Sequence, residues 1–524
     1  MAAPIKTWFL MVLFLWASPF CIGNFVQSEC LNVPASEFVG SVRSTIEAVE
    51  QVMSIVSKFS GIFGDDLRLS TAISDCLDLL DFSMDELSMT ISASQNSKVK
   101  ENKTRNLSAD MKTWLSGTLT NQDTCLEGFA GTDSFVKSLV LGTLDRITSL
   151  VCDMLSMVRP SPNEAPSKGV RFTGSGGRSG DRKLMTNDQF PYWLESHDRK
   201  LLQATKGVTP NVVVAIDGTG NFTSIMDAVS RAPDHSTKRY VIYIKKGVYR
   251  ENVNITKKKW NIIMIGDGID VTVISGNRNY VDGWTTYSTA TFAVKGKGFI
   301  ARDITFENTA GPEKHQAVAF LSDSDLSVLY RCGMRGYQDT LYAHSMRQFY
   351  RECHITGTVD FMFGDGTVVF QNCQILARKG LPNQKNTITA QGRKESGENT
   401  GFSIQFCYIS AEPDVLASLN STPTYLGRPW KKYSRTVIMQ SYISNAIRSE
   451  GWLEWNETFA FDTLFYGEYM NYGPGAGLGS RVKWPGYHAI NDSAQASTFT
   501  VSQFIMGNTW LPSTGVKYIA GLAI

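Results

Sequence analysis

The sequence of 524 residues has almost no net charge and few histidines, and both shortages exclude kinds of function. Its 51 Lys and Arg nearly balance its 49 Asp and Glu, so no strong field favours nucleic acid as a partner. The 6 His include no His-Glu-x-x-His pair, and no metal site is predicted. A Gly-x-Ser-x-Gly segment is also missing, which argues against a serine hydrolase of the α/β type.

Long hydrophobic runs are missing too, except for one near the N-terminus. There Lys6 precedes an apolar run from Trp8 to Trp16, followed by Ser18-Pro19 and the small residue Gly23. This layout is typical of a secretory signal peptide, which we expect over residues 1–23, whereas a buried N-terminal helix is the weaker alternative. No later stretch approaches the length of about 18 apolar residues that a membrane anchor needs, so the protein is expected to be secreted without one.

Cysteines and glycosylation sequons agree with secretion. Loss of the signal peptide would leave an even number of cysteines, which suggests disulfides whose connectivity the sequence does not determine. The candidates are Cys76, Cys125, Cys332, Cys353, Cys373 and Cys407. The sequons Asn-x-Ser/Thr begin at Asn102, Asn106, Asn221, Asn254, Asn420, Asn456 and Asn491.

Residues 24–158 have the periodicity of amphipathic helices. Apolar residues recur at helical spacing in four successive segments, which predicts an all-α four-helix bundle. Cys76 and Cys125 are placed to join the second helix to the segment after the third. Residues 159–203 are rich in Pro and Gly, a composition typical of a linker. Two basic clusters, Arg182-Lys183 and Arg199-Lys200, stand in it as candidate processing sites.

Residues 204–524 carry short β-rich runs that recur with a period of roughly 20 residues. Such a period suggests a solenoid of stacked β-coils, with a β-sandwich as the competing fold. Cys332, Cys353 and Cys373 follow this period, each one repeat after the last. Residues one coil apart stack at the inter-strand distance of about 4.8 Å, within reach of a disulfide, so the cysteines favour the solenoid.

Two aspartates obey the same period. Asp339 and Asp360 stand one repeat apart among aromatic and apolar neighbours, so they should lie side by side on adjacent coils. Two carboxyl groups about 5 Å apart titrate as a unit, with one ionised and able to attack and one protonated and able to donate. The alternative is that one Asp only caps a turn while the other forms an ion pair with a Lys or Arg. Gln316 and Gln338 nearly follow the period and could offer amide donors to an oxyanion.

Leu426-Gly427-Arg428-Pro429-Trp430 adds a guanidinium that can hold a carboxylate bidentately and an indole that suits a sugar ring. With it, five motifs stand in order: Gly247–Glu251, the Gln316 segment, Tyr337–Tyr342, Gly357–Gly364 and Leu426–Trp430. Through them the chain resembles a plant pectin methylesterase made as a pro-protein, over nearly everything after the signal. The helical part, with Asp75–Leu80 and Thr120–Leu126, is similar to the pectin methylesterase inhibitor domain. That resemblance implies a second cysteine about nine residues after Cys30, but Val39 stands near that place, so Cys30 is either paired to Cys152 or free.

The resemblance implies a fold and a set of roles. The catalytic domain would be an all-β right-handed parallel β-helix, and the enzyme a pectinesterase that needs no cofactor. Asp360 would be the nucleophile and Asp339 the general acid and then the base. The remaining residues that the resemblance places at the site are Gln338 and Gln316 for the oxyanion, Arg428 to orient Asp360, and Thr286, Trp430, Tyr342 and Phe363 along the galacturonan chain.

The resemblance also implies partners. These are methyl-esterified pectin in the plant cell wall, a subtilisin-like protease that frees the enzyme from its autoinhibiting bundle, and inhibitor proteins; we expect a monomer. The first basic cluster ends in Met185 rather than Leu, so Arg199–Leu202 is the favoured cleavage site. A catalytically silent pectin-binding or inhibitor-like wall protein would lack some of these catalytic residues. A polygalacturonase or pectate lyase would need a carboxylate cluster spaced for water or a calcium site.

Overall fold

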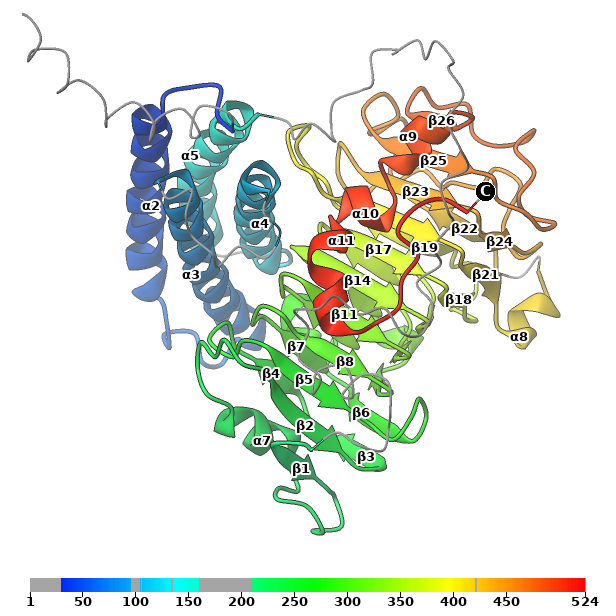
Figure 1. The fold of residues 1–524 in the computed structure, drawn as a ribbon, viewed down its shortest axis with the longest axis horizontal. Coiled ribbons are helices and arrows are strands. Elements are labelled where there is room, and N and C mark those ends of the chain that lie inside the picture. Colours follow the sequence, from blue (N-terminus) through cyan, green and yellow to red (C-terminus); the bar gives the residue numbers. More distant parts are fainter. Residues whose placement is uncertain are drawn as a thin grey trace, which may run out of the picture.

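A computed structural model of the chain describes residues 30–95, 104, 106–132, 135–159, 209–419 and 422–523 (Figure 1). They form a helical bundle beside a larger body of stacked strands. The expected signal peptide, both basic clusters and the sequons at Asn102 and Asn420 lie outside these residues. Within them, no helix combines the length and apolarity that crossing a bilayer requires.

The bundle consists of four long helices, as the periodicity predicted. They are α2 (Ala35–Ser57), α3 (Leu67–Gln95), α4 (Leu107–Gly128) and α5 (Phe135–Met157). In α2 the fully buried Val42, Val49 and Val56 recur at heptad spacing, so one face meets the core. A disulfide joins Cys76 to Cys125. Because α4 runs to Gly128, Cys125 lies inside the third helix and not after it.

The strands form a parallel β-helix of three sheets, which excludes the β-sandwich. Strands of each sheet pair in parallel, as β14 with β17, β15 with β18 and β16 with β19. Sheet 1 has 11 strands, in the order β1 (Val212–Val214), β2 (Tyr240–Ile244), β5 (Ile262–Ile265), β8 (Ile300–Arg302), β11 (Ser327–Tyr330), β14 (Arg347–Arg351), β17 (Thr367–Gln371), β20 (Gly401–Gln405), β23 (Arg435–Met439), β25 (Phe465–Tyr469) and β26 (Tyr487–Ala489). Sheet 2 has 8, in the order β24 (Tyr442–Ile443), β21 (Tyr408–Ala411), β18 (Gln374–Ala377), β15 (His354–Gly357), β12 (Gly333–Arg335), β9 (Thr305–Asn308), β6 (Thr272–Gly276) and β3 (Gly247–Arg250). Sheet 3 has 7, in the order β22 (Thr424–Gly427), β19 (Asn386–Gln391), β16 (Met362–Gly364), β13 (Leu341–Tyr342), β10 (Phe320–Ser322), β7 (Phe292–Val294) and β4 (Val253–Ile255).

The corner between sheets 1 and 2 repeats the same two-residue turn in successive coils. Its first residue has a positive φ, as in Arg331 (50°), Glu352 (55°) and Asn372 (57°). A left-handed residue turns the chain sharply enough to begin the next strand, at a cost of roughly 1–2 kcal/mol for a side chain other than Gly. The second residue of the turn then points into the coil, and in four coils it is a cysteine.

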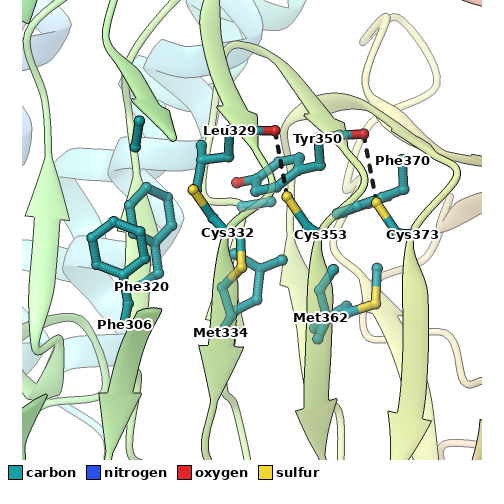
Figure 2. Packing of buried hydrophobic residues seen from close by; sticks show 14 of the residues in the cluster. Phe306, Phe320, Leu329, Cys332, Met334, Tyr350, Cys353, Met362, Phe370 and Cys373 are labelled. Carbon is teal, nitrogen blue, oxygen red and sulfur yellow. Dashed lines mark hydrogen bonds between the residues drawn. The ribbon is translucent and has the colours of Figure 1, made fainter. Parts of the chain in front are cut away.

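These four cysteines form a ladder inside the β-helix, of which Figure 2 shows Cys332, Cys353 and Cys373. Cys332, Cys353 and Cys373 are buried and stacked as the period predicted, and Cys407 joins them on the next coil after a longer interval. All four are free thiols, so the expectation of disulfides among them is wrong. Side chains at matched positions of parallel strands project in parallel, and the thiols bond to carbonyl groups instead. Cys353 Sγ donates to Leu329 O at 3.4 Å, an atom of the preceding coil. Cys152 is also a free thiol, so the pairing with Cys30 is not made.

Short helices close the β-helix at its start and cover sheet 1. α7 (Ile225–Arg231) packs against β1 and β4. At the other end of the chain come α9 (Ser493–Ser497), α10 (Val501–Phe504), α11 (Gly507–Trp510) and η4 (Leu511–Thr514), while η2 (Tyr287–Thr289), η3 (Pro312–Lys314) and α8 (Pro413–Leu416) lie in loops. α10 and α11 lie over sheet 1, where Trp510 packs with Val328 and Phe349 (Figure 1). The opposite side of the β-helix, at sheet 3, is left for the bundle.

The described sequons differ in exposure. Asn106 is half-buried, and its side chain accepts a hydrogen bond from Ala109 N at 3.1 Å as the N-cap of α4. The others are exposed: Asn221, Asn254, Asn456 and Asn491. The glycosylation of each stays a prediction.

Candidate active site

The two aspartates that share the sequence period lie at matching positions of adjacent coils. β13 pairs with β16 so that Leu341 opposes Met362, and Asp339 and Asp360 each stand just before this pair, at equivalent places. Both have a positive φ, 63° and 51°, which Asp tolerates better than most residues. Both side chains are nearly buried, with exposed fractions of 7% and 6%. The fold therefore brings the pair together at the corner between sheets 2 and 3.

Asp360 is held by a fork of hydrogen bonds. Arg428 Nε and Nη2 donate to its two carboxylate oxygens at 2.8 and 2.6 Å. Thr387 Oγ1 donates to Oδ1 at 2.6 Å and accepts from the Asp360 backbone N–H at 2.9 Å. Three donors to one carboxylate, two of them from one bidentate guanidinium, fix the direction of its oxygens.

Asp339 has the opposite environment. Burial raises the pKa of Asp339 well above its ordinary value, the charge of Asp360 adds to the rise, and Arg428 opposes it. Glu127 of α4 also lies near enough for its charge to raise this pKa. The pair thus combines a carboxylate fixed by donors with a carboxyl group that favours its proton, which is the division of roles that acid-assisted nucleophilic attack needs.

The two predicted oxyanion donors flank the pair. Gln338 directly precedes Asp339, and the Gln338 carbonyl accepts from Ala317 N at 3.3 Å, so the Gln316 and Gln338 segments run side by side. Both glutamine side chains are half-buried. Among the described residues neither amide group has a hydrogen-bond partner, which leaves both available to a ligand.

The predicted aromatic residues form one cluster next to the pair. Tyr342 stacks on Phe363 with ring centroids 4.0 Å apart, and Trp430 meets Phe363 edge-on at 5.8 Å. Sequence reasoning missed Trp455, whose ring lies 4.3 Å from the Arg428 guanidinium and is 37% exposed. Such a ring braces the arginine by a cation–π contact. An aromatic residue so far along the chain from Arg428 carries no sequence signal of this role.

Thr286 is the remaining predicted site residue. It is half-buried and precedes η2, where its neighbours Thr285 and Ser288 both donate to Asp75 of α3. Among the described residues, no hydrogen bond or ion pair joins Thr286 to either aspartate. It therefore lies where the bundle meets the β-helix.

The bundle covers the aromatic part of this site. Tyr342 and Phe363, with Trp430 against them, belong to the same apolar cluster as the core of the bundle. Thr124 Oγ1 of α4 lies 2.8 Å from His344 Nε2 and 3.3 Å from the Tyr342 hydroxyl. The aromatic side chains that would meet a sugar chain are thus in contact with helices, and the two bodies share one hydrophobic core.

Buried ionisable groups add to the contact. Asp110 of α4 pairs with Arg347 at 2.5 Å, with exposed fractions of 1% and 3%. Asp75 accepts from Ser288 Oγ at 2.7 Å, yet burial raises the pKa of Asp75 to about 6. Burial also raises the pKa of Glu127 to about 7, although Lys431 opposes this. Docking therefore involves proton uptake by carboxyl groups as well as apolar packing.

Comparison with known proteins agrees with the two bodies seen in the structure. Residues 211–508 match the family model described as Pectinesterase, and residues 31–157 match Plant invertase/pectin methylesterase inhibitor. The chain is 65% identical over 504 residues to pectinesterase/pectinesterase inhibitor PPE8B of Prunus persica, covering 96% of this chain and 92% of that one. It is 47% identical over 498 residues to pectinesterase 2.1 of Solanum lycopersicum, covering 95% and 86%.

A solved structure is similar to the β-helix. Pectin methylesterase from carrot superposes with a TM-score of 0.60 at 53% identity, covering 61% of this chain and 100% of that chain. That share corresponds in size to the β-helix alone. In that relative a chain of this kind thus folds without a helical bundle.

Proposed function

Because the chain belongs to the pectinesterase family and carries an inhibitor-family domain, it is a carboxylic ester hydrolase acting on pectin, and we propose that Asp360 and Asp339 perform its chemistry. Asp360 attacks the C6 carbonyl of a methyl galacturonate unit, and the bond to the methoxy oxygen breaks. Asp339 gives its proton to that oxygen, so methanol leaves. Asp339 then takes a proton from water, whose oxygen attacks the acyl carbon. The bond between that carbon and Asp360 breaks, and the new galacturonic carboxyl group gives its remaining proton to solvent.

The observation that carries this proposal is the unequal treatment of the two carboxyl groups. Arg428 and Thr387 donate three hydrogen bonds to Asp360, whereas burial and the charge of Asp360 raise the pKa of Asp339. The half-buried amides of Gln316 and Gln338 are free to donate to the negative oxygen of the tetrahedral intermediate. Tyr342, Phe363 and Trp430 supply flat apolar faces for sugar rings, and no step requires a cofactor.

The bundle is proposed to inhibit the enzyme until it is cut away. Its contacts with Tyr342, Phe363 and His344 occupy the surface that substrate needs. Cleavage after Arg199-Lys200, or after Arg182-Lys183, by a subtilisin-like protease would convert docking from an intramolecular to a bimolecular event. Secretion to the cell wall, a monomeric state and regulation by separate inhibitor proteins belong to the same proposal.

Methanol release from methylated pectin tests the proposal in three samples. Residues 204–524 should be active, the full-length chain should release methanol much more slowly, and Asp360→Ala in residues 204–524 should be inactive. Equal rates in the two wild-type forms would overturn autoinhibition. Equal rates for wild type and Asp360→Ala would overturn the catalytic assignment.

A further inference from the structure

Helix α4 comes very close to the corner of the β-helix that follows β13. Met346 occupies this corner in the left-handed conformation, with a φ of 67°, and only 5% of its surface is exposed. A Cβ on Gly117 of α4 would lie 2.8 Å from Met346 Cε, so any other residue at position 117 would have to push the buried methionine aside. The glycine therefore leaves a notch in α4 that receives the methyl group of Met346.

Arg347, the first residue of β14, carries a charge across the same interface. Its Nη1 donates to Asp110 of α4 at 2.5 Å, and the exposed fractions of the two side chains are 3% and 1%. Its Nε and Nη2 donate to Asp325 of the preceding coil at 2.9 and 2.6 Å, which fixes the direction of the guanidinium within the β-helix. The β-helix thus presents an oriented cation, and the bundle supplies the acid that pairs with it.

The corner formed by Met346 and Arg347 lies apart from the catalytic pair. Both catalytic aspartates precede their strands of sheet 3, whereas this corner follows β13. Asp110, Gly117 and Thr124 recur at heptad spacing on α4, so they share one face of the helix. Thr124 meets the aromatic cluster, while the other two meet the corner. The first half of α4 therefore contacts groups that have no part in the proposed chemistry.

We propose that the bundle recognises its β-helix through this corner, and that the corner makes the bundle selective. A bundle freed by cleavage binds β-helices that carry an arginine here, a second copy of this enzyme domain included, and rejects β-helices that lack it. The inference rests on the proposed function and deepens it by naming what the inhibitory bundle recognises. A neutral residue at position 347 would leave Asp110 buried without its cation, and such a mismatch is a strong basis for rejection.

Transfer of the bundle between β-helices tests this selectivity. The donor is the full-length chain cut once at an engineered protease site within residues 159–203. The acceptor is a tagged form of residues 204–524, which corresponds to a domain that folds alone in the carrot relative. The share of the bundle captured on the acceptor gives its affinity relative to the donor's own β-helix. Wild-type acceptor should capture half at equal concentrations, whereas about 100-fold more Arg347→Gln acceptor should be needed.

A donor that carries Asp110→Asn separates recognition from damage to the acceptor. Because this bundle has no buried charge to pair, its preference for the wild-type acceptor over Arg347→Gln should fall from about 100-fold to below about tenfold. An Arg347→Gln acceptor that was merely misfolded would lose both donors equally. Equal preferences of the two donors would therefore overturn the proposal.

Gly117→Ala in the donor tests the notch in the same way. Its added methyl group would meet Met346 and would also lie 2.7 Å from Glu86 Oε1 of α3. The wild-type acceptor should capture this bundle less well, and Met346→Ala in the acceptor should restore part of the capture because it removes one of the two contacts. An equal loss with both acceptors would overturn the fit between Gly117 and Met346.

Arg250→Gln in the acceptor is the matched control, because Arg250 is exposed on β3 of sheet 2 and makes the same change of charge. It should capture the bundle as well as wild type does. Wild-type and Arg347→Gln acceptors that capture equal shares would overturn the selectivity. A full-length chain as active in methanol release as residues 204–524 would overturn the proposed autoinhibition instead, while selective capture would still support recognition at the corner.

Discussion

Docking of the bundle should weaken as pH rises, and Asp75 of α3 should account for part of the effect. Its pKa rises from 3.8 to about 6 because desolvation outweighs the hydrogen bonds from Thr285 and Ser288. A group whose pKa is raised by docking takes up a proton, so its stabilising effect is complete below about pH 4 and is lost as pH rises through about 6. A rise of this size corresponds to about 3 kcal/mol, or roughly a 150-fold fall in the docking constant.

The assay is methanol release by the full-length chain relative to residues 204–524 between pH 4 and 7. Wild-type full-length protein should become relatively more active as pH rises. Asp75→Asn is uncharged throughout and keeps polar groups for Thr285 and Ser288, so its relative activity should rise less and be lower at pH 7. Asp145→Asn, at an exposed position of α5, is the control. The reasoning fails if Asp75→Asn and wild type rise equally.

Substitutions at four further positions in residues 204–524 test how the site is held. In steady-state methanol assays, Arg428→Gln should lower kcat about 100-fold and Thr387→Val should lower kcat about tenfold. Small and equal losses of kcat would mean that neither residue orients Asp360. Gly357→Ala would put a Cβ 2.2 Å from Phe361 Cβ, so the thermal midpoint should fall by several degrees, and an unchanged midpoint would contradict that contact. Trp455→Ala should lower kcat/KM about fivefold, a loss equivalent to the energy of one exposed cation–π contact, and Trp455→Phe should restore most of the activity. No loss in Trp455→Ala would show that the ring does not brace the arginine.

The pairing of Asp339 with Asp360 could be predicted because, in a β-helix, residues one sequence period apart lie side by side on adjacent coils. Their separation along the chain equals one coil, and β13 and β16 pair in this register. The same rule predicted the cysteine ladder but not its chemistry. Whether stacked thiols bond to each other depends on side-chain direction, and here carbonyl groups of the preceding coil accept from them.

Other parts of the site depend on contacts between segments that no short motif records. Thr387 stands a full coil beyond the carboxylate it supports, and Trp455 is brought to Arg428 by a loop beyond β22. The salt bridges of Asp123 join a helix of the bundle to lysines far along the chain in the β-helix. Helical periodicity predicts the buried face of α4, but only docking reveals what the remaining face meets.

The central claim is that Asp339 is protonated when Asp360 attacks. It is tested most directly by the pH dependence of kcat/KM for residues 204–524, which reports the ionisation of groups in the free enzyme. Wild type should lose activity on the alkaline side as Asp339, with its raised pKa, gives up its proton. Asp339→Asn should be slower, with that alkaline fall removed. An alkaline fall unchanged in Asp339→Asn would contradict the account.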